Sequence, residues 1–74
     1  MDENLSSPIE YMVEFHLEGN TQKQYRHFQG YTALDVDEMF KQALVIDDID
    51  KDTLINYTIS RYDRFNESWL IQKI

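Results

Sequence analysis

The sequence predicts a single α+β domain whose elements follow the order ββαββ. Two separate segments alternate apolar and polar residues with a period of two, which is typical of strands buried on one side. Between them the apolar residues change to the spacing of an amphipathic helix. We therefore expect a largely antiparallel four-stranded sheet with the helix packed on one face, and the other face open to solvent or to a second subunit.

The first two strands are predicted to form a hairpin. From Ile9 onward, apolar residues occupy every second position, at Tyr11, Val13, Phe15 and Leu17. Gly19-Asn20 supplies turn residues, and residues 23–32 form the second strand. In that strand Tyr25 and Phe28 have opposite parity, which predicts a β-bulge near Gly30.

The helix is the clearest element. Its apolar face consists of Val36, Met39, Phe40, Ala43 and Leu44. Asp35 and Glu38 have the spacing of a capping box with Asp35 as the cap, and Leu34 and Met39 have the spacing of a hydrophobic staple.

The remaining segments complete the domain. Residues 47–52 form an acidic connector, because like charges at this density disfavour a helix or a strand. The segment 54–62 is a strand with Ile55, Tyr57 and Ile59 on one face, residues 63–68 form a turn, and residues 69–74 form the last strand. Residues 1–8 are predicted to be a flexible tail, and residues 9–74 the folded domain.

Length and composition exclude several classes of protein. The 74 residues suffice for one domain, and the absence of Cys excludes disulfides, thiolate metal sites and cysteine nucleophiles. The acidic start, Met1-Asp2-Glu3-Asn4, is unlike a signal peptide, and no apolar run is long enough to span a bilayer. We expect a cytoplasmic protein.

Negative charge is concentrated in two blocks. The chain has 14 acidic and 7 basic residues, a net charge of −7. Residues 1–18 contain five acidic residues and no Lys or Arg, and residues 35–52 contain seven acidic residues and two lysines. This balance argues against direct binding to nucleic acid or to an anionic membrane, and favours a basic protein partner. Rows of carboxylates can imitate the phosphates of DNA. Alternatively, the acidity serves only solubility, with Lys23 and Arg26 pairing across the hairpin with Glu14 and Glu18.

In size and composition the chain resembles the small host-takeover proteins of bacteriophages. The acidic blocks EYMVEFHLE and DDIDKD, the absence of Cys and the small size carry this resemblance over the whole chain. It implies a DNA-mimicking inhibitor of a basic host protein, such as a nucleoid protein, a nuclease or a polymerase, acting in the bacterial cytoplasm. The resemblance supplies no site residues.

The candidate binding residues are acidic side chains with an electrostatic role and two apolar neighbours that set specificity. The apolar residues are Met12 and Phe65. The acidic residues are Glu10, Glu14, Glu18, Asp35, Asp37, Glu38, Asp47, Asp48, Asp50 and Asp52. The alternative function is an adaptor that binds through a sheet edge or an aromatic patch.

Metal binding and catalysis find little support in the sequence. Asp48, Asp50 and Asp52 match the start of a calcium loop, but Thr53 and Ile59 stand where that loop needs Gly and Glu. His16, His27 and Glu14 could bind zinc only if the hairpin brings them together. Ser60, His16 and Asp63 are too scattered for a hydrolase. We expect a non-enzymatic protein without metal or cofactor.

Aromatic residues outnumber what one helix on a small sheet can cover. A homodimer would bury some of them. The residues in excess are Tyr25, Tyr31, Tyr62, Phe65 and Trp69.

Overall fold

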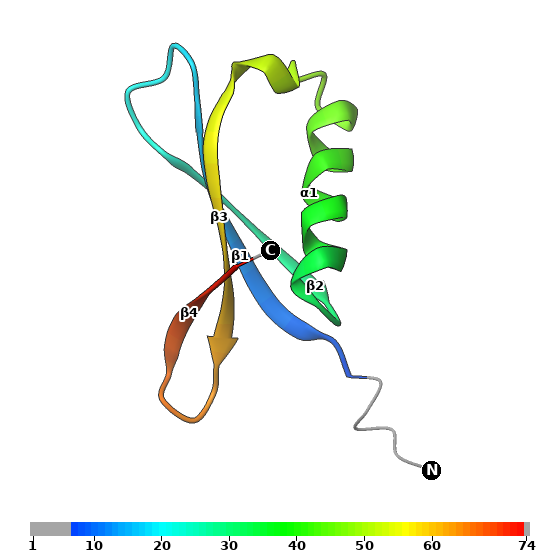
Figure 1. The fold of residues 1–74 in the computed structure, drawn as a ribbon, viewed down its shortest axis with the longest axis vertical. Helices are drawn as coiled ribbons and strands as arrows, with labels where there is room; N and C mark the ends of the chain where they lie inside the picture. The colour runs from blue at the N-terminus through cyan, green and yellow to red at the C-terminus, as the bar shows by residue number, and fades with distance from the viewer. Residues whose placement is uncertain (1–6, 74) are drawn as a thin grey trace.

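The computed structural model describes residues 7–73. The elements are β1 (Ile9–Leu17), β2 (Gln24–Gly30), the helix α1 (Ala33–Ile46), the 3-10 helix η2 (Lys51–Thr53), β3 (Leu54–Asp63) and β4 (Ser68–Gln72). This confirms the predicted ββαββ order (Figure 1). Of the predicted tail, only Ser7 and Pro8 belong to the described residues.

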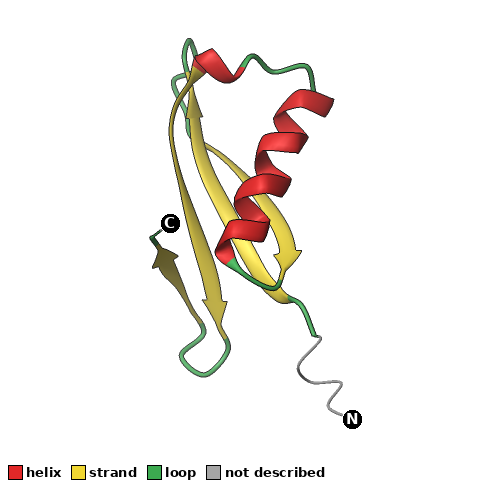
Figure 2. Ribbon diagram, turned by 45° about the vertical axis from the view of Figure 1, so that its right-hand side comes forward, coloured by secondary structure: helices red, strands yellow, loops and turns green. Residues whose placement is uncertain are grey.

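The four strands form one antiparallel sheet in the order β2-β1-β3-β4. The helix α1 packs on β1, β2 and β3, and β4 lies on the side of the sheet away from it (Figure 2). We call the face under α1 the inner face and the opposite one the outer face. β1 and β3 are therefore the two inner strands of the sheet, and β2 and β4 are its edges.

The core lies between α1 and the inner face. Its fully buried aromatic residues are Phe15 on β1 and Phe40 on α1, whose ring centroids are 5.1 Å apart. Phe40 also stacks on Tyr57 of β3, again at 5.1 Å. The buried apolar residues are Tyr11, Val13, Phe15, Leu17, Val36, Phe40, Leu44 and Ile59. The alternation in β1 and the helical spacing in α1 were therefore sufficient to identify most of this core.

The helix begins earlier than the capping box predicted. Thr32 is the N-cap, and its hydroxyl oxygen accepts a hydrogen bond of 3.1 Å from the backbone N–H of Asp35. Asp35 thus lies in the first turn, so its predicted role as the cap is wrong. The predicted staple is also wrong, because Leu34 already belongs to the helix and is exposed.

The predicted bulge near Gly30 is absent from the pairing of β1 with β2. The register runs without a shift from Ile9 opposite Gly30 to Phe15 opposite Gln24. Phe28 faces inward beside Tyr11, and Tyr25 faces outward beside Glu14. The opposite parity of the two aromatic residues therefore means opposite faces of a regular strand.

Gly30 has a steric rather than a conformational role. It is buried where α1 comes close to the sheet, and a Cβ at this position would lie 3.0 Å from Cγ2 of Val36. A side chain here would push the first turn of α1 away from β2.

The bulge lies instead in β3. Between His16 and Leu17 the partner on β3 changes from Asn56 to Leu54, so that Ile55 has no partner on β1. Leu54 packs against the core, whereas Ile55 is 56% exposed. The prediction that Ile55 shares a face with Tyr57 and Ile59 is therefore wrong, because one extra residue reverses the alternation at the start of this strand.

The outer face carries a smaller aromatic cluster. Trp69 of β4 packs against Tyr62 of β3 with the two rings tilted and their centroids 5.1 Å apart, and it forms a T-shaped pair with the ring of His27 on β2 at 5.9 Å. Since β2 and β4 are the two edges of the sheet, Trp69 reaches across the outer face. Ser60, on the same face opposite Met12 and Ile71, is buried.

Candidate functional site

The helix α1 ends in a turn that directs Asp48 outward. Asp48 has a φ of 60°. Its backbone N–H donates to the carbonyl of Val45 at 3.0 Å, and that of Ile49 donates to the carbonyl of Leu44 at 2.8 Å. These two bonds are those of a Schellman motif, in which glycine is the usual residue at the position of Asp48. The motif ends the helix and leaves the carboxylate of Asp48 exposed.

The 3-10 helix η2 fixes the next two aspartates. The side chain of Asp50 caps η2 by accepting a hydrogen bond of 2.9 Å from the N–H of Asp52. The carbonyl of Thr53, in turn, accepts a 2.6 Å hydrogen bond from the N–H of Glu18, the residue after β1. The last residue of the first acidic block therefore lies beside the second block. We call Glu18, Asp48, Asp50 and Asp52 the acidic end.

The negative charge of the acidic end is not balanced by ion pairs. All four side chains are exposed, and within residues 7–73 none of them forms an ion pair. Asp47, in contrast, is neutralised, because it accepts a hydrogen bond from the guanidinium of Arg26 on β2. Lys51 is the single cationic residue between Asp47 and Thr53. This end of the molecule thus presents four carboxylates against one unpaired ammonium group, that of Lys51, because the nearby Lys41 is paired with Asp37.

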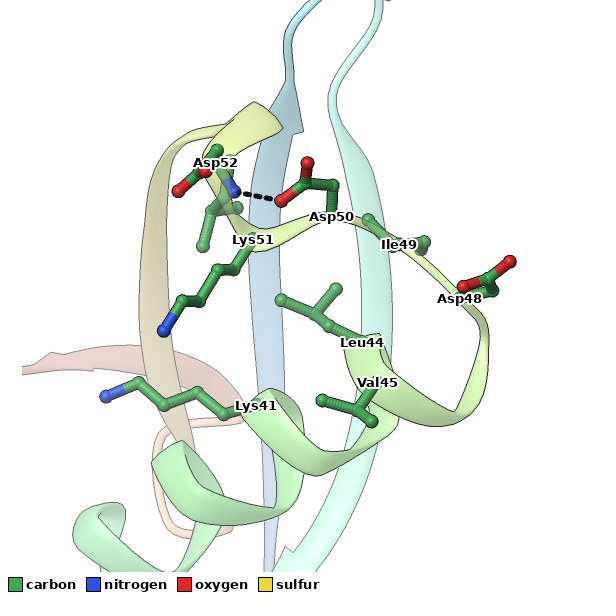
Figure 3. Close-up of a pocket in the computed structure, with 9 residues that line it drawn as sticks. Lys41, Leu44, Val45, Asp48, Ile49, Asp50, Lys51 and Asp52 are labelled. Carbon is green, nitrogen blue, oxygen red and sulfur yellow. Dashed lines mark hydrogen bonds between the residues drawn. The ribbon is translucent and has the colours of Figure 1, made fainter.

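A cleft of about 900 Å³ lies beside these carboxylates, between the last turns of α1 and the segment that runs into η2 (Figure 3). Its apolar wall includes Val45, which is 77% exposed. Figure 3 shows Lys41 and Lys51 pointing to one side of the cleft and Asp48 at the opposite side. The lining residues are Lys41, Leu44, Val45, Asp48, Ile49, Asp50, Lys51, Asp52 and Leu54.

The acidic rim of this cleft could be predicted from the sequence, but its apolar wall was not. The missed signal is the run Ala43-Leu44-Val45-Ile46, in which four consecutive apolar residues exceed what one buried helix stripe can use. Leu44 belongs to the buried stripe, and Val45 and Ile46 are left exposed.

The acidic residues of β1 lie on the outer face, apart from the acidic end. The ammonium group of Lys23 is 3.0 Å from the carboxylate of Glu14, and its hydrogen bond to Glu14 raises the pKa of Lys23. Glu10 lies 3.8 Å from the ring of His27. The pairing of Lys23 with Glu14 that the solubility interpretation expected is therefore present, whereas Arg26 pairs with Asp47 rather than with Glu18.

Asp35, Asp37 and Glu38 lie in the first half of α1, and Asp37 faces inward. Asp37 is 8% exposed, accepts a 2.5 Å hydrogen bond from the hydroxyl of Tyr57, and lies 2.9 Å from the ammonium group of Lys41. Burial acts to raise the pKa of Asp37, but the bonds from Tyr57 and Lys41 together lower it below its usual value. Asp37 thus holds α1 to β3, and its charge is balanced within the fold.

Neither of the two apolar candidates lines the cleft. Met12 is half-buried on the outer face, opposite His27 and Ser60. Phe65 lies in the turn between β3 and β4 and is 98% exposed. The ten carboxylates and two apolar residues therefore do not form one continuous surface, and only Glu18, Asp48, Asp50 and Asp52 are brought together with unbalanced charge.

The structure gives no support to the metal sites that the sequence analysis considered. His27 lies opposite Met12 rather than His16, and a ring nitrogen of His16 is 2.9 Å from the carbonyl oxygen of Asn20. In residues 7–73 no group of three or more His, Asp or Glu side chains is arranged to hold a metal ion. Over the same stretch, no helix has the length and apolar character needed to cross a membrane.

Comparison of the chain with protein-family models, with curated proteins and with solved structures finds no significant match.

Proposed function

We propose that this protein is a non-enzymatic binding protein that holds a positively charged surface of another protein at its acidic end. The observation that carries the proposal is the gathering of Glu18, Asp48, Asp50 and Asp52 at one end without ion pairs among the described residues. Such a cluster of like charges attracts a basic partner and accelerates its association.

The partner class that we propose is a basic, nucleic-acid-binding protein, which the chain inhibits by imitating DNA. The net charge of −7 supports this class, because the same charge opposes direct contact with nucleic acid. The acidic end, rather than the full set of ten carboxylates, is the surface proposed for the contact. The bacterial cytoplasm is the proposed place of action, as the resemblance to bacteriophage host-takeover proteins implies.

The test combines partner capture with two variants of equal charge. The immobilised chain is exposed to a bacterial lysate, and retained proteins are eluted with a salt gradient and, separately, with duplex DNA. One variant neutralises the acidic end (Glu18→Gln, Asp48→Asn, Asp50→Asn, Asp52→Asn). Its control neutralises four carboxylates elsewhere (Glu10→Gln, Glu14→Gln, Asp35→Asn, Glu38→Gln). Both variants carry the same net charge.

We expect the first variant to lose a basic partner that the control retains, and duplex DNA to displace that partner from the unmodified chain. Equal losses in both variants would show that total charge, rather than the acidic end, governs binding. A partner that resists both salt and DNA would refute the proposed function.

An adaptor that binds by an aromatic contact is the second candidate function, and the exposure of Phe65 favours it. A phenylalanine that is 98% exposed in a turn is available to a partner surface. A complex formed through Phe65 would be insensitive to salt and to DNA, and would be lost in Phe65→Ser. The salt gradient therefore separates the two functions.

A further inference from the structure

We propose that the cleft between α1 and η2 seats one bulky apolar side chain from a Lys- or Arg-containing segment of the partner. This inference rests on the proposed function and adds the anchor that would give the contact its specificity. An electrostatic contact alone attracts many basic proteins, whereas an apolar pocket beside the charges selects among them.

The apolar part of the argument concerns the wall of the cleft. Leu44 and Leu54 pack on the core, and Ile49 contacts it from the loop, so that these three form a supported surface. Val45 extends this surface outward and is 77% exposed. An apolar side chain entering the cleft would cover Val45 and remove its own surface from water.

The charges around the cleft determine which residues of the partner segment can flank that apolar side chain. Asp48, Asp50 and Asp52 line the cleft and form no ion pair within the described residues, whereas the ammonium group of Lys41 is paired with Asp37. Lys51 alone adds unpaired positive charge to the lining. The balance is therefore negative, which matches a cationic segment and opposes an acidic one.

The arrangement of these charges also orients the segment. Lys41 and Lys51 lie on one side of the cleft together with Asp52, and Asp48 lies on the other (Figure 3). Because Lys41 is paired with Asp37, the unpaired ammonium group on the first side is that of Lys51, which would repel a lysine or arginine of the partner, whereas Asp48 on the other side would attract one. We therefore expect the cationic residues to lie on only one side of the apolar anchor.

The probes are synthetic nonapeptides with a single variable position next to a run of lysine and arginine. Leu or Ser is placed at the variable position, and binding to the full chain is measured by fluorescence anisotropy. Burial of a leucine side chain corresponds to about a ten- to hundredfold gain in affinity over serine. A third peptide places the leucine in the centre of the cationic run, and we expect it to bind more weakly than the peptide with cations on one side.

The adjacent residues Val45 and Ile46 provide matched variants. Both are exposed, at 77% and 81%, but only Val45 lines the cleft. Val45→Ser is expected to reduce the preference for leucine to less than about threefold, and Ile46→Ser to leave it unchanged. Because both positions are exposed, neither variant should unfold the protein, and thermal unfolding verifies this.

The outcomes separate this inference from the proposed function. Equal affinity for the leucine and serine peptides, with binding that falls steeply with salt, would overturn the anchor and leave the acidic end as a purely electrostatic surface. Equal effects of Val45→Ser and Ile46→Ser would also overturn it. If none of the cationic peptides binds at low salt, both the anchor and the proposed function fail.

Discussion

The hydroxyl of Tyr57 on β3 donates a 2.5 Å hydrogen bond to Asp37 on α1, and this bond joins the helix to the sheet at a buried carboxylate. The same bond raises the pKa of Tyr57, with burial as the second cause. Lys41 completes the arrangement from the next turn of α1. The contact is polar, but it lies next to the stacked rings of Phe40 and Tyr57 and so depends on the core around it.

Removal of the Tyr57 hydroxyl should destabilise the fold in a pH-dependent manner. The pKa of Asp37 is lower in the folded chain than in the unfolded one, so its ionisation stabilises the fold above the unfolded value of about 3.9. That contribution disappears as the pH falls through the folded value. We expect Tyr57→Phe to cost about 1–3 kcal/mol at pH 7 and less below pH 3, measured by urea unfolding.

The control for this prediction is Tyr25→Phe, which removes a hydroxyl from an exposed tyrosine of β2. It should change the free energy of unfolding by less than about 0.5 kcal/mol at either pH. If Tyr57→Phe lowers the free energy of unfolding equally at pH 7 and below pH 3, the bond to the ionised carboxylate of Asp37 does not stabilise the fold.

The two glycines should respond differently to alanine. Gly30→Ala places a Cβ 3.0 Å from Val36 and should cost about 1–3 kcal/mol through overpacking. Gly19→Ala meets no atom within 4 Å, and its cost should be about 1 kcal/mol from the φ of +91° alone. Urea unfolding in a Val36→Ala background separates the two causes, since only the penalty at Gly30 should shrink there. A penalty at Gly30 that is the same in both backgrounds would contradict the steric explanation.

The N-cap assignment can be tested at Thr32 and Asp35. Thr32→Ala should cost about 0.5–2 kcal/mol, because the N–H of Asp35 loses its partner. Asp35→Ala removes only a favourable charge in the first turn and should cost less, about 0.3–1 kcal/mol. Thermal unfolding of both variants measures the difference, and Thr32→Ser should restore most of the stability. A larger loss of stability in Asp35→Ala than in Thr32→Ala would support the capping box predicted from the sequence, with Asp35 as the cap.

Replacement of Asp48 should separate stability from binding. Glycine adopts a φ of 60° without steric cost, so we expect Asp48→Gly to stabilise the protein by about 0.5–1 kcal/mol. The same variant removes one carboxylate from the acidic end and should weaken the proposed complex. Urea unfolding and peptide binding measured on one preparation test both effects. A loss of stability would contradict the Schellman assignment.

The parts of the fold that repeat a simple period could be predicted from the sequence, and the local exceptions could not. Alternation in β1 and helical spacing in α1 are set by which side chains leave water, and such patterns are visible along the chain. The bulge at Ile55 depends on how β3 aligns with a strand that is distant in sequence. At the start of α1, Thr32 and Asp35 are both good caps, and only the path of the chain from β2 decides between them.

The candidate site was predictable only in part for the same reason. The density of aspartates after Ile46 indicated an exposed acidic segment. The placement of Glu18 beside η2 depends on one backbone hydrogen bond between residues 35 positions apart, Glu18 and Thr53. The balancing of Glu14, Asp37 and Asp47 likewise depends on which bases the fold brings near. Charge counted along the chain therefore overestimated the surface on which unpaired carboxylates lie together.

The inner position of β1, between β2 and β3, has a consequence for how the chain folds. Val13 pairs with Arg26 early in the chain but also with Ile59, which lies 46 positions further on (59 − 13). The first hairpin and the helix can form locally, but the second side of β1 stays unpaired until the last third of the chain reaches it. Closing this long loop should be the slow, entropically costly step of folding. A chain that stops before β3 would leave one side of β1 as an exposed, unpaired strand edge that is prone to aggregation.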